Sequence, residues 1–232
     1  GGKVQDFRYR LLPVFANLIE ADAEMDAYIT KVRAPYQAKL DQELAVSEGL
    51  LYRRGNFNGS WDQLIVDALM EVRGADMALS PGFRWGTTIL PGQAITRDHL
   101  MDQVAITYPT STLTQMSGSM VKTVLEDIAD NLFNPDPYYQ QGGDMVRVGG
   151  LEYTCDPTAP SGQRITDMRL NGRLVEADKT YKVAGWAPVA EGAEGPAIWD
   201  VMEDYFKAHP VIKTRKINTP KVVNMVGNPG IA

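Results

Sequence analysis

The sequence has 232 residues, of which 44% are hydrophobic and 22% are charged, as in an ordinary globular domain. Its 23 basic and 29 acidic residues give a net charge of -6, which does not favour nucleic acid or an anionic membrane as a partner. No apolar run approaches the roughly 18 to 20 residues that span a bilayer, and the first ten residues lack the order of a secretion signal. We therefore expect one soluble domain with an appendage, already processed or truncated.

Metal ligands and nucleophiles are scarce in this sequence. The single cysteine, Cys155, excludes an internal disulfide and leaves the redox compartment open. The two histidines, His99 and His209, lie far apart with no HxH, HxxxH or CxxC spacing beside them. No GxSxG motif is present. We expect no self-contained metal site and no catalytic residue here, so the central chemistry of any enzyme containing this chain would lie elsewhere.

The first half of the chain is predicted to alternate helices and strands. From 22 to 44 the apolar residues recur at helical spacing and Pro35 interrupts them, which predicts a long helix or a helix pair. Ser60 to Gln63 has the S-x-x-Q form of a capping box and begins a helix that ends at Gly74. A short strand is predicted over 76–80, and Thr96 begins a short helix.

The second half changes to a strand-rich pattern. We predict a strand over 111–116, a turn at Ser117 and Gly118, and a helix whose apolar face runs from 120 to 132. Strands follow over 145–155, 164–170 and 180–187, then a helix over 196–206 and a strand around 221–226, with Asn171 and Gly172 as a hairpin turn. The sequence thus predicts a mixed α/β domain over 45–232 behind a helical lead over 1–44.

Two basic loops are candidate anion sites. Phe83, Arg84 and Trp85 follow a predicted strand, where open α/β sheets place ligand-contacting loops. An arginine there can clamp an oxyanion bidentately while the aromatic rings exclude water; the alternative is that Arg84 stacks on Trp85 for packing alone. Arg53 and Arg54 form a second such loop with the same two interpretations.

A glycine-rich segment runs from 142 to 150. Gly142, Gly143 and Asp144 stand at its start, where glycine permits close backbone approach to a ligand or to another strand. A Gly-Gly pair also occurs in bulges and tight turns. The spacing is not GxGxxG and no helix opens directly after it, so a dinucleotide loop is disfavoured. The Asp136 and Asp144 carboxylates are expected to be solvated.

Four segments, taken together and in order, resemble a known family. They are LLYRRGNF (50–57), ADMALSPGFRWG (75–86), GGDMVRVGGL (142–151) and YKVAGWA (181–187). This set is similar to the C-terminal domain of the 5′-nucleotidase superfamily, within it most of all to the thiosulfohydrolases of bacterial sulfur oxidation. The resemblance implies a 5′-nucleotidase-like layered sheet and helices preceded by a helical interdomain connector.

The resemblance also implies an activity for the parent protein. Family members carry an N-terminal metallophosphoesterase domain with two metal ions, Mn²⁺ in the sulfur-oxidising branch, and that domain is not in this sequence. The C-terminal domain closes over the substrate, and the family's anion-contacting arginine falls on Arg84, with Arg53 and Arg54 matching earlier arginines. The implied substrate is a cysteine S-thiosulfonate on the C-terminal arm of a sulfur-carrier protein, hydrolysed to sulfate in the periplasm. The expected binding residues are Arg53, Arg54, Phe83, Arg84, Trp85, Gly142, Gly143 and Asp144.

The sequence departs from the nucleotidase pattern where those enzymes hold the base. Nucleotidases place one aromatic residue before a Gly-Asn pair and another before G-G-D-G-Y, whereas the corresponding segments here are 106–110 and 186–196. This departure favours a small oxyanion on a peptide arm. Two alternatives stay open: a nucleotidase domain for a phosphate ester, and a carrier-binding module without catalysis.

Overall fold

The computed structural model describes residues 2–15, 18–53, 55, 57–83, 85–188 and 192–227, and it divides between Leu40 and Asp41 into two compact units. The first unit carries helices α1 (Ala23–Arg33) and α2 (Gln37–Leu40), separated at Pro35, which confirms the predicted helix pair. Asp22 caps α1 by accepting a hydrogen bond of 2.9 Å from the Met25 N–H. Among the described residues, no helix is both long and apolar enough to span a membrane.

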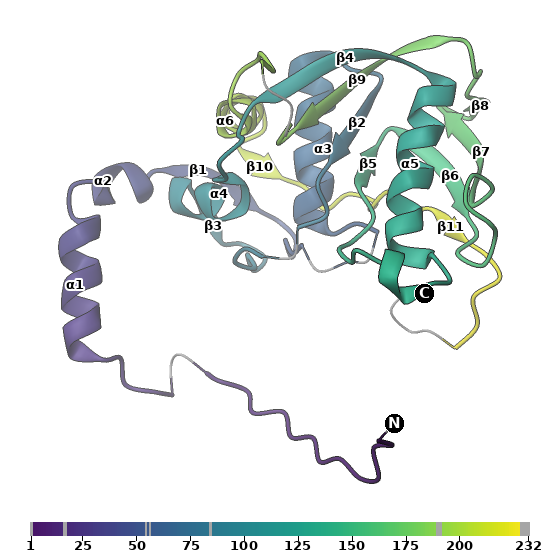
Figure 1. The fold of residues 1–232 in the computed structure, drawn as a ribbon. Helices are drawn as coiled ribbons and strands as arrows, with labels where there is room; N and C mark the ends of the chain where they lie inside the picture. Colours follow the sequence, from purple (N-terminus) through teal and green to yellow (C-terminus); the bar gives the residue numbers. More distant parts are fainter. Residues whose placement is uncertain are drawn as a thin grey trace. The chain divides into compact units, whose positions relative to one another are not determined.

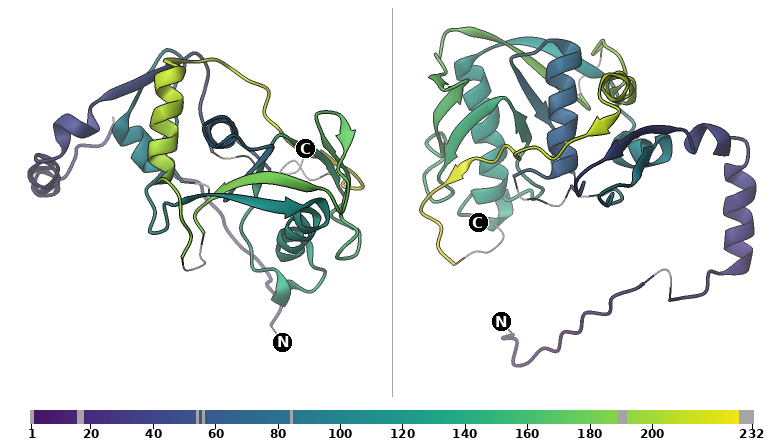
Figure 2. Two further views of the ribbon diagram at one scale, coloured as in Figure 1. Left: turned by 90° about the horizontal axis from the view of Figure 1, so that it is seen from above. Right: turned by 180° about the vertical axis from the view of Figure 1, so that it is seen from behind.

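The second unit is built on a four-stranded sheet in the order β4-β9-β2-β5. Its strands are β4 (Ser111–Ser117), β9 (Thr180–Trp186), β2 (Met77–Ser80) and β5 (Arg147–Gly149), and only the β2–β9 pair is parallel. Helices α3 (Ser60–Arg73) and α5 (Gly118–Phe133) cover its two faces (Figures 1 and 2). The alternation of side chains along β9 explains this, because Ala184 and Trp186 pack with α3 whereas Tyr181 and Val183 pack with α5.

Two smaller sheets flank the four-stranded one. The first has the order β10-β1-β3 and the second β11-β6-β7-β8. Their strands are β1 (Glu43–Ser47), β3 (Ala94–Thr96), β6 (Leu151–Cys155), β7 (Ile165–Leu170), β8 (Arg173–Leu174), β10 (Val211–Ile212) and β11 (Lys221–Val222). The remaining helices of the described chain are α4 (Arg97–Val104), α6 (Ile198–Ala208) and the 3-10 turn η1 (Pro137–Tyr139). These elements form the layered sheet-and-helix architecture that the sequence predicts.

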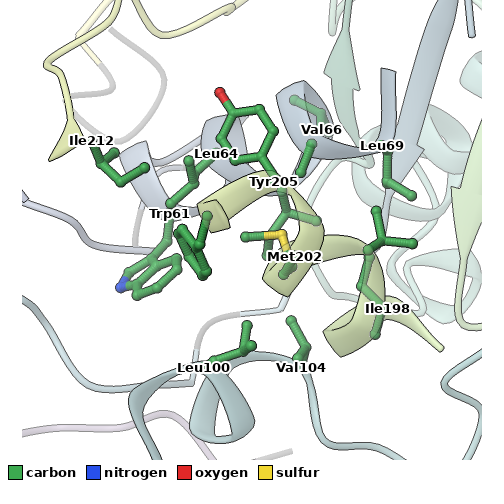
Figure 3. Packing of buried hydrophobic residues seen from close by; sticks show 14 of the residues in the cluster. Trp61, Leu64, Val66, Leu69, Leu100, Val104, Ile198, Met202, Tyr205 and Ile212 are labelled. Atoms are coloured by element: carbon green, nitrogen blue, oxygen red, sulfur yellow. The ribbon is translucent and has the colours of Figure 1, made fainter. Parts of the chain in front are cut away.

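The larger core cluster joins α3, α4 and α6 to the β10-β1-β3 sheet (Figure 3). Trp61 and Leu64 from α3 pack there with Met202 from α6, and all three are at most 3% exposed. Burial of such side chains contributes roughly 1.5–3 kcal/mol each. This cluster fixes the N-terminal end of α3, which carries part of the candidate site.

Several local predictions need correction. Ser60 does not cap α3, because Gly59 is the N-cap; the Ser60 hydroxyl instead donates to the Leu50 carbonyl at 2.7 Å. Ser117 and Gly118 form no separate turn but the N-cap and first residue of α5. The predicted strand 145–155 is two strands in different sheets, separated at Gly150, whose φ is +78°. Strand β1 was not predicted, and its first residues fall within the segment assigned to the lead.

Candidate functional site

The side chains of Phe83 and Trp85, in the loop that follows β2, pack with Trp186 into a group of rings that we call the aromatic wall. The ring centroids of Phe83 and Trp85 lie 3.9 Å apart in a stacked arrangement, and the edge of Trp186 meets Phe83 at 5.7 Å. Trp186 is fixed by donating its indole N–H to the Ser80 hydroxyl at 2.7 Å. Since Trp85 is 45% exposed while Trp186 is only 5% exposed, Trp85 offers the aromatic surface that a ligand can reach. Arg84, between these aromatic residues, lies outside the described residues.

Arg53 lies beneath this wall rather than on the surface. Its side chain is 1% exposed, and its Cζ atom is 5.6 Å from the Phe83 ring centroid. Its Nε and Nη2 atoms face Asp62 Oδ1 at 2.9 and 2.8 Å, and Nη1 donates to the Gln103 carbonyl at 2.7 Å. Burial lowers the pKa of Arg53, an effect that the Asp62 carboxylate opposes. Nε and Nη1 are hydrogen-bonded and Nη2 pairs with the Asp62 carboxylate, so the guanidinium group of Arg53 is held within the protein against the Phe83 ring. Arg54 lies outside the described residues.

The glycine loop, which we define as Gly142 to Asp144, has an unusual backbone conformation. Gly142 and Gly143 have φ values of +79° and +94°, and a Cβ atom added to either would meet nothing within 4 Å. Glycine is thus favoured here by the positive φ and leaves open space above the backbone. The Gly142 N–H donates to the Asn131 carbonyl at 3.4 Å, which ties the loop to α5.

The side chain of Asp144, the next residue, is buried, so the prediction of a solvated carboxylate at this position is wrong. Its carboxylate is 3% exposed and lies 2.9 Å from the Nη2 atom of Arg147. The two loops also touch each other, because a Cβ atom on Gly82 would lie 2.8 Å from the Asp144 Cβ. The structure therefore brings the Phe83–Trp85 loop, Arg53 and Asp144 together.

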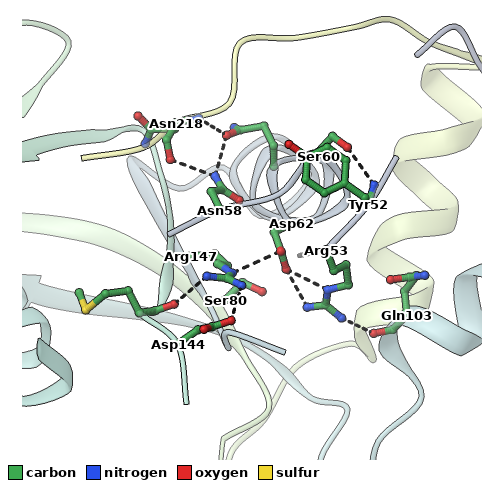
Figure 4. A network of polar contacts seen from close by, with 12 residues as sticks. Tyr52, Arg53, Asn58, Ser60, Asp62, Ser80, Gln103, Asp144, Arg147 and Asn218 are labelled. Carbon is green, nitrogen blue, oxygen red and sulfur yellow. Dashed lines mark hydrogen bonds and ion pairs between the residues drawn. The ribbon is translucent and has the colours of Figure 1, made fainter. Parts of the chain in front are cut away.

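Arg147 and Asp62, which the sequence pattern did not indicate as site residues, connect these parts (Figure 4). Arg147 is fully buried on β5, and its Nε atom lies 3.3 Å from Asp62 Oδ2. Asp62 is fully buried in the first turn of α3, where the helix dipole favours a carboxylate. Burial raises the pKa of Asp62, and the guanidinium groups of Arg53 and Arg147 act against this rise. The available signal was an arginine within the apolar run of the 145–149 strand.

The described residues do not fit a two-metal site. No group of three or more His, Cys, Asp or Glu side chains in the described part of the chain is arranged to hold a metal ion. His99 completes the capping box of α4 with Thr96, and the Nε2 atom of His209 lies 2.8 Å from a Glu71 carboxylate oxygen. Both histidines thus have structural partners, and no chemical step is assigned to a metal in this chain.

Comparisons with known proteins agree on a family. The model of the 5′-nucleotidase C-terminal domain matches residues 46–204, more than half of the chain. Among solved structures, the sulfate thiohydrolase SoxB of Thermus thermophilus, in complex with glycerol, is 38% identical with a TM-score of 0.87, over 95% of this chain and 42% of its own. A 5′-nucleotidase precursor from Thermus thermophilus is 19% identical with a TM-score of 0.69, over 86% of this chain and 43% of its own.

A third structure, the NAD nucleotidase of Haemophilus influenzae, is 20% identical with a TM-score of 0.64, over 87% of this chain and 41% of its own. No match was found among curated proteins. The chain thus spans less than half the length of each of these solved relatives. The two nucleotidase structures carry evidence on the fold alone.

Proposed function

Because the chain belongs to the 5′-nucleotidase C-terminal domain family, we propose that it is the substrate-binding domain of a thiosulfohydrolase resembling SoxB. The observation that carries this proposal is the 38% identity with SoxB over 95% of the chain, against 19% for the 5′-nucleotidase precursor. The proposed substrate is a cysteine S-thiosulfonate on the arm of a sulfur-carrier protein, and the proposed compartment is the periplasm.

The proposed reaction is a hydrolysis. Water adds its oxygen to the terminal sulfonate sulfur, the bond between this sulfur and the inner sulfur breaks, and the bonding pair leaves with the carrier as a persulfide. The products are the carrier persulfide, sulfate and a proton, so no oxidant is required. Activation of the water is expected in the family's N-terminal metallophosphoesterase domain with its two Mn²⁺ ions. This chain binds and orients the substrate.

The geometry of the aromatic wall supports a small substrate on an extended arm. Trp186 stands in the segment where nucleotidases hold a base, yet its ring is buried and its N–H is bonded to Ser80. We therefore assign the arm to the exposed ring of Trp85 and to the open backbone of Gly142 and Gly143. We assign the sulfonate contact to Arg84 because a guanidinium fork matches such an oxyanion.

Sulfate release from a thiosulfonated carrier by the full-length protein tests this proposal, with AMP hydrolysis measured in parallel. We expect sulfate to form and AMP to persist. AMP hydrolysis without sulfate release would favour the nucleotidase alternative. Carrier binding without either reaction, in a parent protein that lacks a metal-binding half, would favour the non-catalytic module.

The assignment of Arg84 is tested by Arg84→Lys in the same protein. Lysine keeps the charge but loses the planar fork, so turnover is expected to fall by about tenfold or more with an unchanged melting temperature. Arg173→Lys, on the exposed strand β8, is the matched control and should leave turnover unchanged. Wild-type kinetics for Arg84→Lys would return Arg84 to a packing role.

The placement of the carrier arm is tested by NMR with a thiosulfonated arm peptide and this chain. Because half of a binding cleft buries little area and an arm loses conformational entropy on ordering, we expect a Kd on the order of 100 micromolar or weaker. Shifts are expected at Trp85, Gly142 and Gly143. Shifts confined to residues 209–216 would contradict this placement.

A further inference from the structure

Both loops of the candidate site are held by one carboxylate. Asp62 Oδ1 faces Arg53 beneath the Phe83–Trp85 loop, whereas Asp62 Oδ2 faces Arg147, which binds Asp144 at the end of the glycine loop. We propose that Asp62 is a positioning residue that sets the separation of these two loops, to which the proposed function assigns the substrate arm. Its effect on turnover rests on the proposed function, whereas its effect on the loops does not.

The first branch runs from Asp62 through Arg53 to the aromatic wall. Asp62 fixes two nitrogens of Arg53, whose cationic carbon then lies under the Phe83 ring at 5.6 Å. The third nitrogen donates to the Gln103 carbonyl, and the Gln103 side chain donates to the Thr87 carbonyl at 3.0 Å. Arg53 therefore supports the Phe83 ring, and Gln103 holds the chain at Thr87, two residues after Trp85.

The second branch runs from Asp62 through Arg147 to the glycine loop. Arg147 Nε lies 3.3 Å from Asp62, its Nη1 donates to the Met145 carbonyl at 3.3 Å, and its Nη2 binds Asp144 at 2.9 Å. Gly142 and Gly143 directly precede this anchored stretch, and no side chain of their own fixes them. Asp144 anchors one end of this pair, and the Asn131 carbonyl, which accepts from the Gly142 N–H, anchors the other.

Asparagine at position 62 cannot serve both branches. A carboxylate offers an acceptor oxygen to each arginine, whereas an amide offers one oxygen and presents its NH₂ group to the other arginine. In either orientation of the amide one arginine faces an NH₂ group in place of an anionic oxygen, and both arginines lose the charge that pairs with them. A change at Asp62 should therefore move the two loops together, although neither loop contains this residue.

The test is NMR of the 232-residue chain, with the Trp85 indole N–H reporting on the wall and the Gly142 and Gly143 amides on the glycine loop. We expect Asp62→Asn to shift all three signals by more than a linewidth. Arg53→Lys should shift the Trp85 signal more than the glycine signals, and Asp144→Asn should shift the two glycine signals more than the Trp85 signal. The control is Asp127→Asn, an exposed carboxylate on α5, which should shift none of them. The proposal is overturned if Asp62→Asn leaves either set in place or if the control shifts both sets.

A double-mutant cycle decides the matter if Asp62→Asn does not fold. The cycle combines Arg53→Lys with Asp144→Asn. These two residues do not pair with each other in the described contacts but are linked through Asp62 and Arg147. Non-additive changes in the free energy of unfolding are expected, and additive changes would overturn the proposal.

Turnover by the full-length protein separates this proposal from the proposed function. Asp62→Asn should lower kcat/KM for the thiosulfonated carrier by about tenfold, mainly through KM, while Asp127→Asn stays near wild type. If the wild-type full-length protein releases no sulfate, the proposed function is rejected. The NMR result still decides whether Asp62 positions the two loops.

Discussion

Replacing Glu126 by glutamine tests how tightly α5 is tied to the chain before β7. The Glu126 side chain is 8% exposed and accepts three backbone hydrogen bonds. Its Oε2 atom accepts from Gly162 at 3.0 Å and Arg164 at 3.2 Å, and its Oε1 atom accepts from Ile165 at 2.8 Å. Two of these N–H groups, those of Arg164 and Ile165, belong to buried residues and would otherwise lack a solvent partner, whereas Gly162 is exposed.

Glutamine retains one acceptor oxygen, so at least one of these N–H groups would face an amide NH₂ group. A hydrogen bond to a charged group contributes about 1.5–3 kcal/mol, and the bonds that persist lose their charge assistance. We expect the free energy of unfolding to fall by about 2–4 kcal/mol. For a protein of this size, that fall lowers Tm by roughly 4–16 °C.

Urea and thermal unfolding at pH 7, followed by circular dichroism, measure this change. Asp127→Asn is the control, because Asp127 is an exposed carboxylate next to Glu126 on α5, and it should change stability by less than about 0.5 kcal/mol. A change below about 0.5 kcal/mol for Glu126→Gln, with an unchanged dependence on urea, would refute the reasoning, because those N–H groups would then have adequate partners without the carboxylate.

Three other predictions concern the wall, the thiol and metals. Ser80→Ala leaves the buried Trp186 N–H without its acceptor and should cost about 1–3 kcal/mol in urea unfolding; no loss would contradict this contact. Burial, reinforced by nearby carboxylates, raises the pKa of Cys155 from 9.0 to about 11. The folded chain thus holds this proton more tightly, so its free energy of unfolding should fall as pH rises from about 9 to about 11. Native Cys155 should resist a thiol reagent at pH 8 and react in urea, and rapid native reaction would exclude this burial. Calorimetric titration of this chain with Mn²⁺ should give a Kd weaker than about 10 micromolar, and tighter stoichiometric binding would reveal a site of its own.

Periodicity predicted most helices and strands because each depends on residues close in the sequence. The α3 helix ends at Gly74 with a φ of +62°, and Asn171 and Gly172 adopt the positive φ values expected of their turn. The predicted capping box does not form, because Gly59 is the N-cap and the Ser60 hydroxyl donates to the Leu50 carbonyl instead. Sequence pattern could not show that Gly150 divides one apolar run between two sheets, since that depends on which strands lie beside it.

The candidate site was predictable only in part, for a related physical reason. Loop position and the resemblance indicated the aromatic wall and the glycine loop, which each consist of neighbouring residues. The connection between them pairs Asp62 in a helix with Arg147 in a strand, and no local pattern encodes such a pair. The pairing with Asp62 also buries Arg53, whereas its position in a basic loop of the sequence indicated an exposed, ligand-contacting side chain.

The charge balance of this connection bears on which residue would contact the proposed sulfonate. Replacing a buried ion pair by apolar residues is often neutral for stability, so four buried charges are better explained by the orientation that they impose than by stability. With their carboxylates ionised, Asp62 and Asp144 balance the charges of Arg53 and Arg147. These four residues carry no net formal charge as a group, so the sulfonate contact that we propose is assigned to another group. Arg84, which the family motif places between Phe83 and Trp85, is the candidate in this chain, which is why the lysine substitution at that position is the decisive test of the binding site.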